Sequence, residues 1–229
     1  MGAEPVAAIA LTGDERRHFW PTPVREESWT MPGKAENSLE KYRSKRHTGR
    51  TPEPMGGSPR RAGRRHFVVQ KHAASSLHYD FRLEAGGVLK SWAVPKGLST
   101  DPREKRLAVR TEDHPVGYLD FEGVIPEGEY GAGPVIVWDT GTYRNLTERD
   151  GKKVPLTKGV DEGHIKVWLE GEKLHGGYAL TRTGQRGGQE RWILVKVSDA
   201  GADARRNPVS SQPASVRSGR TVEDVAEDA

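Results

Sequence analysis

The sequence predicts a mainly β protein: a small closed antiparallel β-barrel with one or two short flanking helices and disordered termini. Two observations lead to this fold class. Short runs rich in β-branched and aromatic residues recur between His66 and Val197, separated by Gly, Pro and Asp. No long amphipathic helix interrupts these runs, which favours an antiparallel barrel or sandwich over a parallel α/β sheet. A closed barrel is preferred to a sandwich because closure removes exposed strand edges.

Three regions are expected along the 229 residues. Residues 1–37 show no hydrophobic periodicity and are interpreted as a mostly disordered N-terminal extension. Residues 38–199 are predicted to form the barrel domain with a basic N-terminal arm, in which Ser38 is a plausible N-cap for a short helix over Ser38–Arg46. Residues 200–229 are rich in Ala, Ser, Asp, Arg and Pro and are predicted to be a disordered C-terminal tail.

Eight segments have the length and composition of strands. The candidate strands are His66–His72, Leu77–Glu84, Val88–Val94, Leu107–Thr111, Val135–Tyr143, Gly163–Leu169, Gly176–Arg182 and Arg191–Val197. The tryptophans Trp138, Trp168 and Trp192 fall within them and are expected at the core or the rim of the barrel. The glycine-rich stretch Phe121–Gly133 matches neither a P-loop nor a dinucleotide fingerprint, so it is interpreted as a barrel-closing loop.

Composition excludes several classes of protein. The chain has no cysteine, which excludes disulfides, zinc fingers, iron–sulfur clusters and thiol catalysis and fits a reducing cytoplasm. No run approaches the ~20 apolar residues of a membrane helix. The N-terminus does not read as a signal peptide. We therefore expect a cytoplasmic protein with no membrane partner.

Positive charge is concentrated in one region. The net charge is only +4, but nine lysines and arginines lie within residues 41–65 against one acid, Glu53. Such a run is typical either of a solvated basic linker or of an arm that neutralises nucleic-acid phosphates.

The most informative stretch runs from His78 to Arg82. In a strand, side chains alternate faces, so His78, Asp80 and Arg82 share one face while apolar residues share the other. His72 ends the preceding candidate strand, and the intervening loop could fold it beside His78. Two imidazoles and a carboxylate suit Zn, Mn or Fe and leave coordination positions open, as catalytic metal sites do. The Arg82 guanidinium suits a phosphate oxyanion.

Two further sets of residues are candidates for the same site. His114 lies at a strand end with an acid on its N-terminal side, and the Tyr118 hydroxyl could reach the same anion. A capped turn is the structural alternative. Lys96 follows one apolar strand and Arg106 adjoins another, so either could direct a positive charge at a phosphate, although charged runs are usually solvated.

Several motifs recur together in a known order. They are His66–His72, Leu77–Glu84, Ser91–Gly97, Lys105–Val109, Glu112–Pro115, Phe121–Pro126, Gly141–Tyr143 and Trp192–Lys196. In this order they resemble the 3′-phosphoesterase domain of bacterial DNA ligase D. The resemblance covers roughly residues 38–199, and because no ligase or polymerase module follows, the chain resembles a stand-alone version of that domain.

The resemblance implies a metal-dependent enzyme, usually using manganese (Mn²⁺), that trims DNA 3′ ends. Members remove a 3′-terminal ribonucleoside and then the 3′-phosphate, leaving a 3′-hydroxyl for repair synthesis and ligation. The implied substrates are DNA 3′ ends, such as a primer–template duplex, and a separate ligase or polymerase is a possible partner. Carried over by position, the metal ligands are His72, His78 and Asp80, the phosphate-binding residues are Arg82, His114 and Tyr118, and further activity-associated positions are Gln70, Lys96, Arg106, Glu53 and Arg46.

One position departs from the family pattern. His47 stands where members commonly carry an acid after the Lys-Arg pair. The change bears on the contribution of the N-terminal arm and on the balance between ribonucleoside removal and phosphate removal.

The predicted chemistry is metal-assisted hydrolysis of a phosphoester. Arg82 and His114 would stabilise charge on the phosphoryl oxygens, or His114 would instead protonate the leaving oxygen, and the sequence leaves both roles open. Two rival functions are a non-catalytic metal-containing module that binds nucleic-acid ends and an iron-dependent oxygenase, which two histidines and one carboxylate also suit. The nearby positive charges favour a phosphate substrate over the oxygenase.

Overall fold

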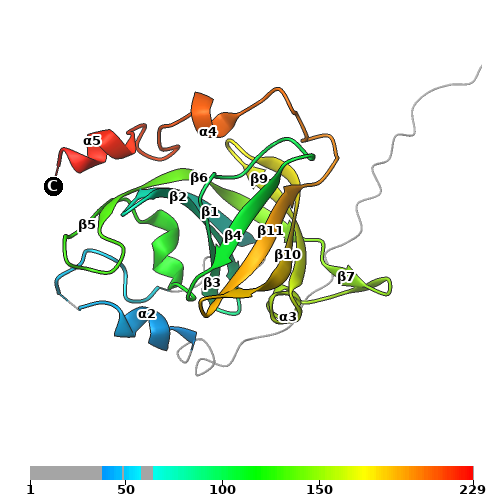
Figure 1. Cartoon of the computed structure of the whole chain (residues 1–229), viewed down its shortest axis with the longest axis horizontal. Coiled ribbons are helices and arrows are strands. Elements are labelled where there is room, and N and C mark those ends of the chain that lie inside the picture. The colour runs from blue at the N-terminus through cyan, green and yellow to red at the C-terminus, as the bar shows by residue number, and fades with distance from the viewer. Residues whose placement is uncertain (1–37, 48, 58–63, 229) are drawn as a thin grey trace, which may run out of the picture.

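Residues 65–196 form a closed antiparallel barrel (Figure 1). The computed structural model describes residues 38–47, 49–57 and 64–228. Eight strands form the barrel. In spatial order they are β1 (Arg65–Ala73), β2 (Leu77–Ala85), β3 (Val88–Val94), β4 (Lys105–Arg110), β11 (Gln189–Lys196), β10 (His175–Arg186), β9 (His164–Gly171) and β6 (Gly133–Asn145). Pairing of β1 with β6 closes the barrel.

The predicted fold class is confirmed, and each of the eight candidate strands overlaps one barrel strand. A short strand, β5 (Gly123–Ile125), extends the sheet from β6 within the predicted barrel-closing loop. The hairpin β7 (Glu148–Arg149) and β8 (Lys152–Lys153) and the helix α3 (Leu156–Glu162) lie between β6 and β9. Among the described residues, no helix is long and apolar enough to cross a lipid bilayer.

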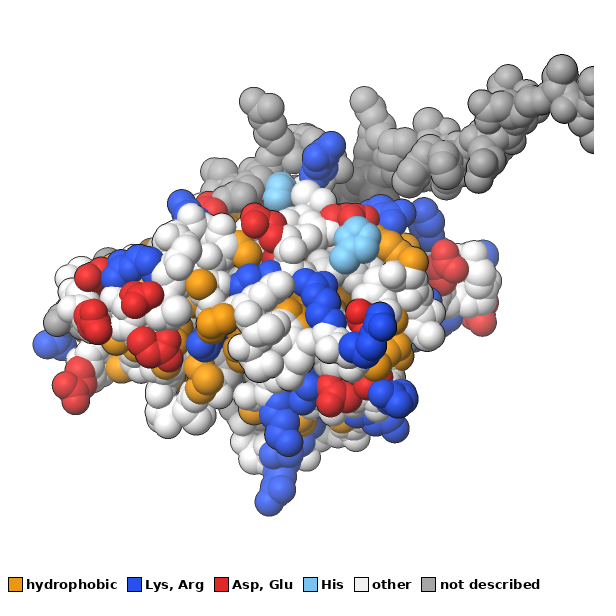
Figure 2. Space-filling view, turned by 90° about the horizontal axis from the view of Figure 1, so that it is seen from above, with side chains coloured by type: hydrophobic (Ala, Val, Ile, Leu, Met, Phe, Trp, Pro, Cys, Tyr) orange, Lys and Arg blue, Asp and Glu red, His pale blue; other side chains and the backbone are white. Residues whose placement is uncertain are grey.

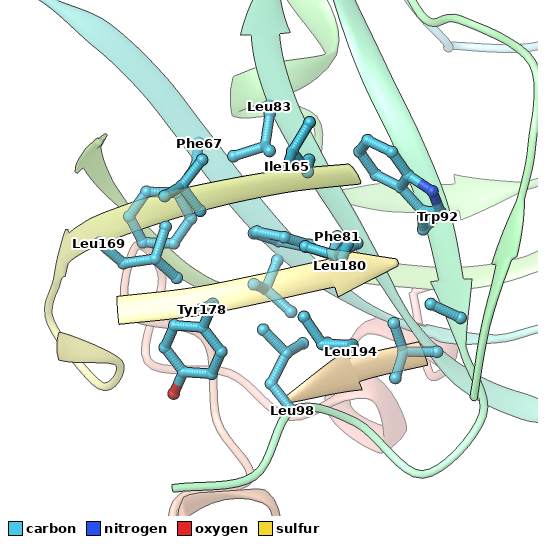
Figure 3. Close-up of a cluster of buried hydrophobic side chains, with 14 of the residues drawn as sticks. Phe67, Phe81, Leu83, Trp92, Leu98, Ile165, Leu169, Tyr178, Leu180 and Leu194 are labelled. Carbon is cyan, nitrogen blue, oxygen red and sulfur yellow. The ribbon is translucent and has the colours of Figure 1, made fainter. Parts of the chain in front are cut away.

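Alternate side chains of every barrel wall point into one apolar core (Figure 3). The fully buried side chains there include Phe67, Phe81, Trp92 and Tyr178. Burial of each such large apolar side chain contributes roughly 1.5–3 kcal/mol to the free energy of folding. Two of the three strand tryptophans, Trp138 and Trp192, are buried in this core as expected. Trp168 lies instead on the outer face of β9, because it alternates with the core residues Val167 and Leu169, and it is partly exposed.

A second apolar cluster covers the outer face of β1 and β6. In this cluster, valines of β1 and β6 pack against side chains of the helix α2 (Glu40–Ser44) and of the 3₁₀ helix η1 (Val116–Asp120). Both faces of this wall are therefore enclosed, and polar side chains that alternate outward on β1 and β2 lie beside a packed layer rather than in open solvent. The predicted N-terminal helix is present, but Leu39 rather than Ser38 is its N-cap, without a side-chain capping bond.

The pairing of β1 with β6 contains a register shift. Val69 pairs with Asp139, whereas the next residue, Gln70, pairs with Val137, so Trp138 is the extra residue of a β-bulge. Trp138 is directed into the barrel core and Val137 into the outer cluster.

Residues 200–228 correct the prediction of a disordered tail. They form the short helices α4 (Pro208–Ser211) and α5 (Val222–Ala226), and α5 contacts β6, β1 and β5 (Figure 1). The indole of Trp138 donates to the Gln212 carbonyl over 2.7 Å, and Val222 and Val225 are buried against Ile136. A few well-spaced apolar residues thus suffice to dock a polar segment. The predicted disordered extension over residues 1–37 lies outside the described residues.

Candidate metal and phosphate site

Antiparallel pairing of β1 and β2 assembles the predicted metal ligands. His72 lies directly opposite His78, and one ligand atom from each of these residues and Asp80 lies within 4.8 Å of the others. The Asp80 Oδ2 atom is 3.4 Å from Nδ1 of His72 and 3.7 Å from Nε2 of His78. The loop between the strands therefore folds His72 beside His78, as the sequence suggested.

Backbone carbonyls determine which nitrogen of each imidazole carries a proton. Nε2 of His72 donates to the Gly131 carbonyl over 2.7 Å, and Nδ1 of His78 donates to the Ser76 carbonyl over 2.9 Å. Because a carbonyl can only accept, a neutral ring keeps its lone pair on the other nitrogen. Those other nitrogens, Nδ1 of His72 and Nε2 of His78, are the ones that face Asp80. This is the tautomer pair that a metal ion requires.

The Asp80 side chain is ionised despite its burial. Burial opposes ionisation, but the Arg82 guanidinium, and the hydrogen bonds that the His72 and His78 rings donate to Asp80 when they are protonated, outweigh it and hold the pKa of Asp80 well below its usual value. Burial also opposes protonation of His78, yet the Asp80 carboxylate and the Ser76 carbonyl raise the pKa of His78 above its ordinary value. The cluster is thus an electron-rich set of two nitrogens and one carboxylate.

The Arg82 guanidinium is held by two hydrogen bonds to side chains, and one of its nitrogens takes part in neither. Its Nη2 donates to Asp80 over 3.0 Å and its Nε to the Gln70 side-chain oxygen over 2.8 Å. Gln70 is fixed in turn by donating to the carbonyls of Tyr118 and Phe121 over 3.2 and 2.9 Å. The Arg82 Nη1 atom is buried and has no hydrogen-bond partner among the described residues. A buried guanidinium donor without an acceptor is a position suited to an anionic oxygen.

His114 is a buried imidazole that lies within reach of the Arg82 charge. Its backbone exchanges two hydrogen bonds with Leu89, and its Nδ1 donates to the Glu112 carbonyl over 2.9 Å. Burial first, and then the positive charges of Arg82 and Arg46, hold the pKa of His114 well below its usual value. Its Nε2 atom therefore carries a lone pair at neutral pH.

Glu53 joins the N-terminal arm to the site. Its Oε1 atom accepts from the Tyr118 hydroxyl over 2.7 Å and from Nε of Arg46 over 2.9 Å. Burial, and then the Glu53 carboxylate, raise the pKa of Tyr118 well above its usual value. The Tyr118 ring lies 4.9 Å from the Arg82 guanidinium, so Tyr118 contacts Arg82 through its ring while its hydroxyl is committed to Glu53.

Lys96 and Arg106 lie together but apart from this cluster. With Pro95, Lys105 and Leu107 they line a cavity of about 220 Å³. Arg106 donates to Glu104 over 2.5 Å, and Lys96 is exposed. Within the described part of the chain, no hydrogen bond or ion pair joins either residue to the metal-ligand cluster.

Two acidic residues that the sequence did not connect with the basic arm bind it. Glu112 accepts from Lys45 over 2.9 Å and contacts Arg46 at 3.5 Å. Glu129 accepts from the backbone of His47 over 3.3 Å and contacts its ring at 3.2 Å, so the residue that departs from the family pattern has an acidic partner. On the face shown in Figure 2, basic and acidic side chains are interspersed rather than separated into single-sign patches.

Fold and site together define a small β-barrel that places a buried arginine beside a candidate metal-ligand cluster. Residues 70–182 match the family model described as the DNA Ligase D 3′-phosphoesterase domain. The chain is 50% identical over 188 residues to the multifunctional non-homologous end joining protein LigD of Pseudomonas aeruginosa, covering 80% of this chain and 22% of that protein.

Two further relatives give the same result. The LigD protein of Mycolicibacterium smegmatis is 46% identical over 165 residues, which are 71% of this chain and 21% of that protein. The LigD protein of Mycobacterium tuberculosis is 46% identical over 162 residues, which are 70% of this chain and 20% of that protein. The chain belongs to the DNA ligase D 3′-phosphoesterase domain family and spans about a fifth of the length of these relatives.

Proposed function

We propose that this domain is a divalent-metal-dependent phosphoesterase that processes DNA 3′ ends for non-homologous end joining. It would remove a 3′-terminal ribonucleoside and a 3′-phosphate and leave a 3′-hydroxyl. The observation that carries the proposal is a single juxtaposition: Arg82 donates to the carboxylate of the candidate metal-ligand cluster, and its Nη1 atom is buried with no partner in the described part of the chain. The names of the relatives, which describe multifunctional end-joining proteins, support DNA ends as the substrate.

The residues present fit a divalent ion such as Mn²⁺. Nδ1 of His72, Nε2 of His78 and an oxygen of Asp80 would hold it, and such a set leaves positions for water and substrate. A bound divalent metal polarises a phosphoryl oxygen and lowers the pKa of a bound water.

The protein's own part in catalysis is to bind and orient the phosphate. Nη1 of Arg82 would donate to a phosphoryl oxygen, in a geometry already held by Gln70 and Asp80. Because these contacts exist before substrate arrives, little reorganisation accompanies the development of charge on the phosphate.

His114 would enter the reaction without a proton on Nε2. In that state it can accept a hydrogen bond from a protonated phosphate oxygen but cannot act as a general acid. A bound phosphate would offset the positive charge of Arg82 and raise the proton affinity of Nε2. We therefore propose that His114 takes up a proton together with phosphate. A pH–rate profile of His114→Gln beside wild type tests an acid role, which is wrong if both proteins keep the same limbs.

The function is tested with primer–template DNA whose primer ends either in a 3′-phosphate or in one ribonucleotide. With Mn²⁺, wild type should produce a 3′-hydroxyl that a polymerase extends, and EDTA should prevent it. Arg82→Ala and Asp80→Asn should lose product. Arg182→Ala should not, because it removes an arginine of β10 that pairs with Glu190 of β11. Binding of these ends by wild type without any product would support the non-catalytic end-binding module instead.

A further inference from the structure

The exposed aromatic side chain of Tyr130 lies beside the candidate site. Among the described residues, two large apolar side chains are about half exposed: Tyr130 at 50% and Leu77 at 48%. Large exposed aromatic rings are used by proteins that bind single strands or frayed ends, because every nucleobase has a flat face that stacks.

The position of Tyr130 links it to both halves of the site. The next residue, Gly131, supplies the carbonyl that accepts from the metal ligand His72. The Arg46 guanidinium lies 5.9 Å from the Tyr130 ring centroid and 3.7 Å from the Tyr42 ring, and Tyr42 is 4.9 Å from the His114 ring. Tyr130 thus flanks the cluster on the side of His114 and the N-terminal arm.

The segment that carries Tyr130 is fixed before any ligand binds. The preceding residue, Glu129, is bound by the backbone and ring of His47, and turn hydrogen bonds of 3.1 and 3.2 Å anchor Glu129 to Pro126 and Ala132. The Lys45 ammonium group lies 4.2 Å from the Tyr130 ring centroid. A pre-ordered ring loses little conformational entropy when it stacks on a ligand.

Leu77 does not share this setting. It precedes His78, so strand alternation places it on the opposite face from that ligand. It pairs with Ala73, which packs against the C-terminal cluster of Val222 and Val225. Leu77 therefore serves as a control of nearly equal exposure that lies next to the candidate ligand His78 in sequence but on the other face of its strand.

We propose that Tyr130 is the stacking platform for the nucleobase of the nucleotide whose 3′ oxygen carries the scissile phosphate. The inference rests on the proposed function for its substrate and adds a residue that positions the DNA end. The same nucleotide occupies this place in ribonucleoside removal and in phosphate removal, so one platform serves both reactions. Stacking tolerates any base, so recognition of the end is independent of its sequence.

The experiment combines protein variants with two substrates. One primer–template carries a normal 3′-phosphorylated terminal nucleotide, and the other carries an abasic sugar there. On the normal end, Tyr130→Ala should raise KM and Kd by roughly 5- to 150-fold, the range of one base–aromatic stack, with kcat little changed. Tyr130→Trp should retain wild-type values, Leu77→Ala should behave as wild type, and on the abasic end Tyr130→Ala and wild type should be equal.

Three outcomes would overturn the platform: no change for Tyr130→Ala, an equal loss on normal and abasic ends, or the same loss for Leu77→Ala. Unfolding midpoints and Mn²⁺ affinities of the variants show whether the fold and the metal cluster are intact. If wild type releases no product, the proposed function fails, and the Kd values for the two ends then judge the platform separately.

Discussion

Removal of the Glu53 carboxylate should destabilise the fold strongly, because this group is a buried acceptor shared by three donors. Glu53 is 3% exposed and accepts from Arg46, Tyr118 and Thr51 over 2.9, 2.7 and 2.9 Å. Loss of one partner of a buried ion pair costs about 3–5 kcal/mol. Arg46 would keep the Tyr42 carbonyl at 3.1 Å, which places this loss near the lower limit, and the Tyr118 hydroxyl would lose an acceptor worth about 1 kcal/mol. The expected cost of Glu53→Ala is therefore about 4 kcal/mol.

Urea unfolding followed by tryptophan fluorescence measures this free energy. Glu53→Gln keeps an acceptor oxygen for Tyr118 and loses only the charge, so about 2 kcal/mol is expected. Glu162→Ala is the surface control: Glu162 pairs with Arg149 at 2.9 Å, but both side chains are substantially exposed, so a change below about 1 kcal/mol is expected. If Glu53→Ala costs no more than Glu162→Ala, the assignment of Glu53 as the link between arm and site is wrong.

Three more predictions concern the metal, the buried histidine and the C-terminal segment. Mn²⁺ at 100 times its Kd should stabilise wild type by about 2.7 kcal/mol, and thermal unfolding of Asp80→Asn should be insensitive to it; an equal response would refute the ligand set. In metal-free protein, the lowered pKa of His114 means that only the unfolded state binds its proton as pH falls below about 6.5. The free energy of unfolding that depends on neutral His114 is therefore lost toward pH 5, and His114→Gln should lose less of it than wild type. The raised pKa of His78 acts in the opposite direction, but equally in both proteins. Equal pH dependence of unfolding in the two proteins would contradict this prediction. Val225→Asp should cost roughly 3 kcal/mol or more by burying a charge, and an unchanged unfolding midpoint would show that the tail does not support the barrel.

Local patterning was enough to predict the barrel. The strand runs are dense in β-branched and aromatic residues, and period-two alternation identified which face of β2 is apolar. Phe81 is indeed in the barrel core, while Asp80 and Arg82 lie on the other face. The C-terminal segment escaped prediction because its docking depends on a few apolar contacts, such as Val222 and Val225 with Ile136, and these are too sparse to produce a periodic signal.

The site was predictable where it depends on one strand pair and not where it depends on loops. The spacing of His72, His78 and Asp80 brought the cluster together through a single hairpin. The Gly131 carbonyl that orients His72 leaves no signature in the sequence, because any residue type carries a carbonyl. The bond from Tyr118 to Glu53 joins positions 65 residues apart, so only the folded chain reveals it.

The extra residue at Trp138 has a consequence for how the barrel tolerates change. Strand side chains repeat with a period of two, so loss of one residue from β6 near the bulge would invert the facing of the strand beyond it. Trp138, which belongs in the barrel core, would then change faces with a neighbour such as Val137, which belongs in the outer cluster. The fold should therefore tolerate insertions and deletions at this point of β6 far less well than in the β7–β8 hairpin. It should still tolerate point substitutions of similar side-chain volume there.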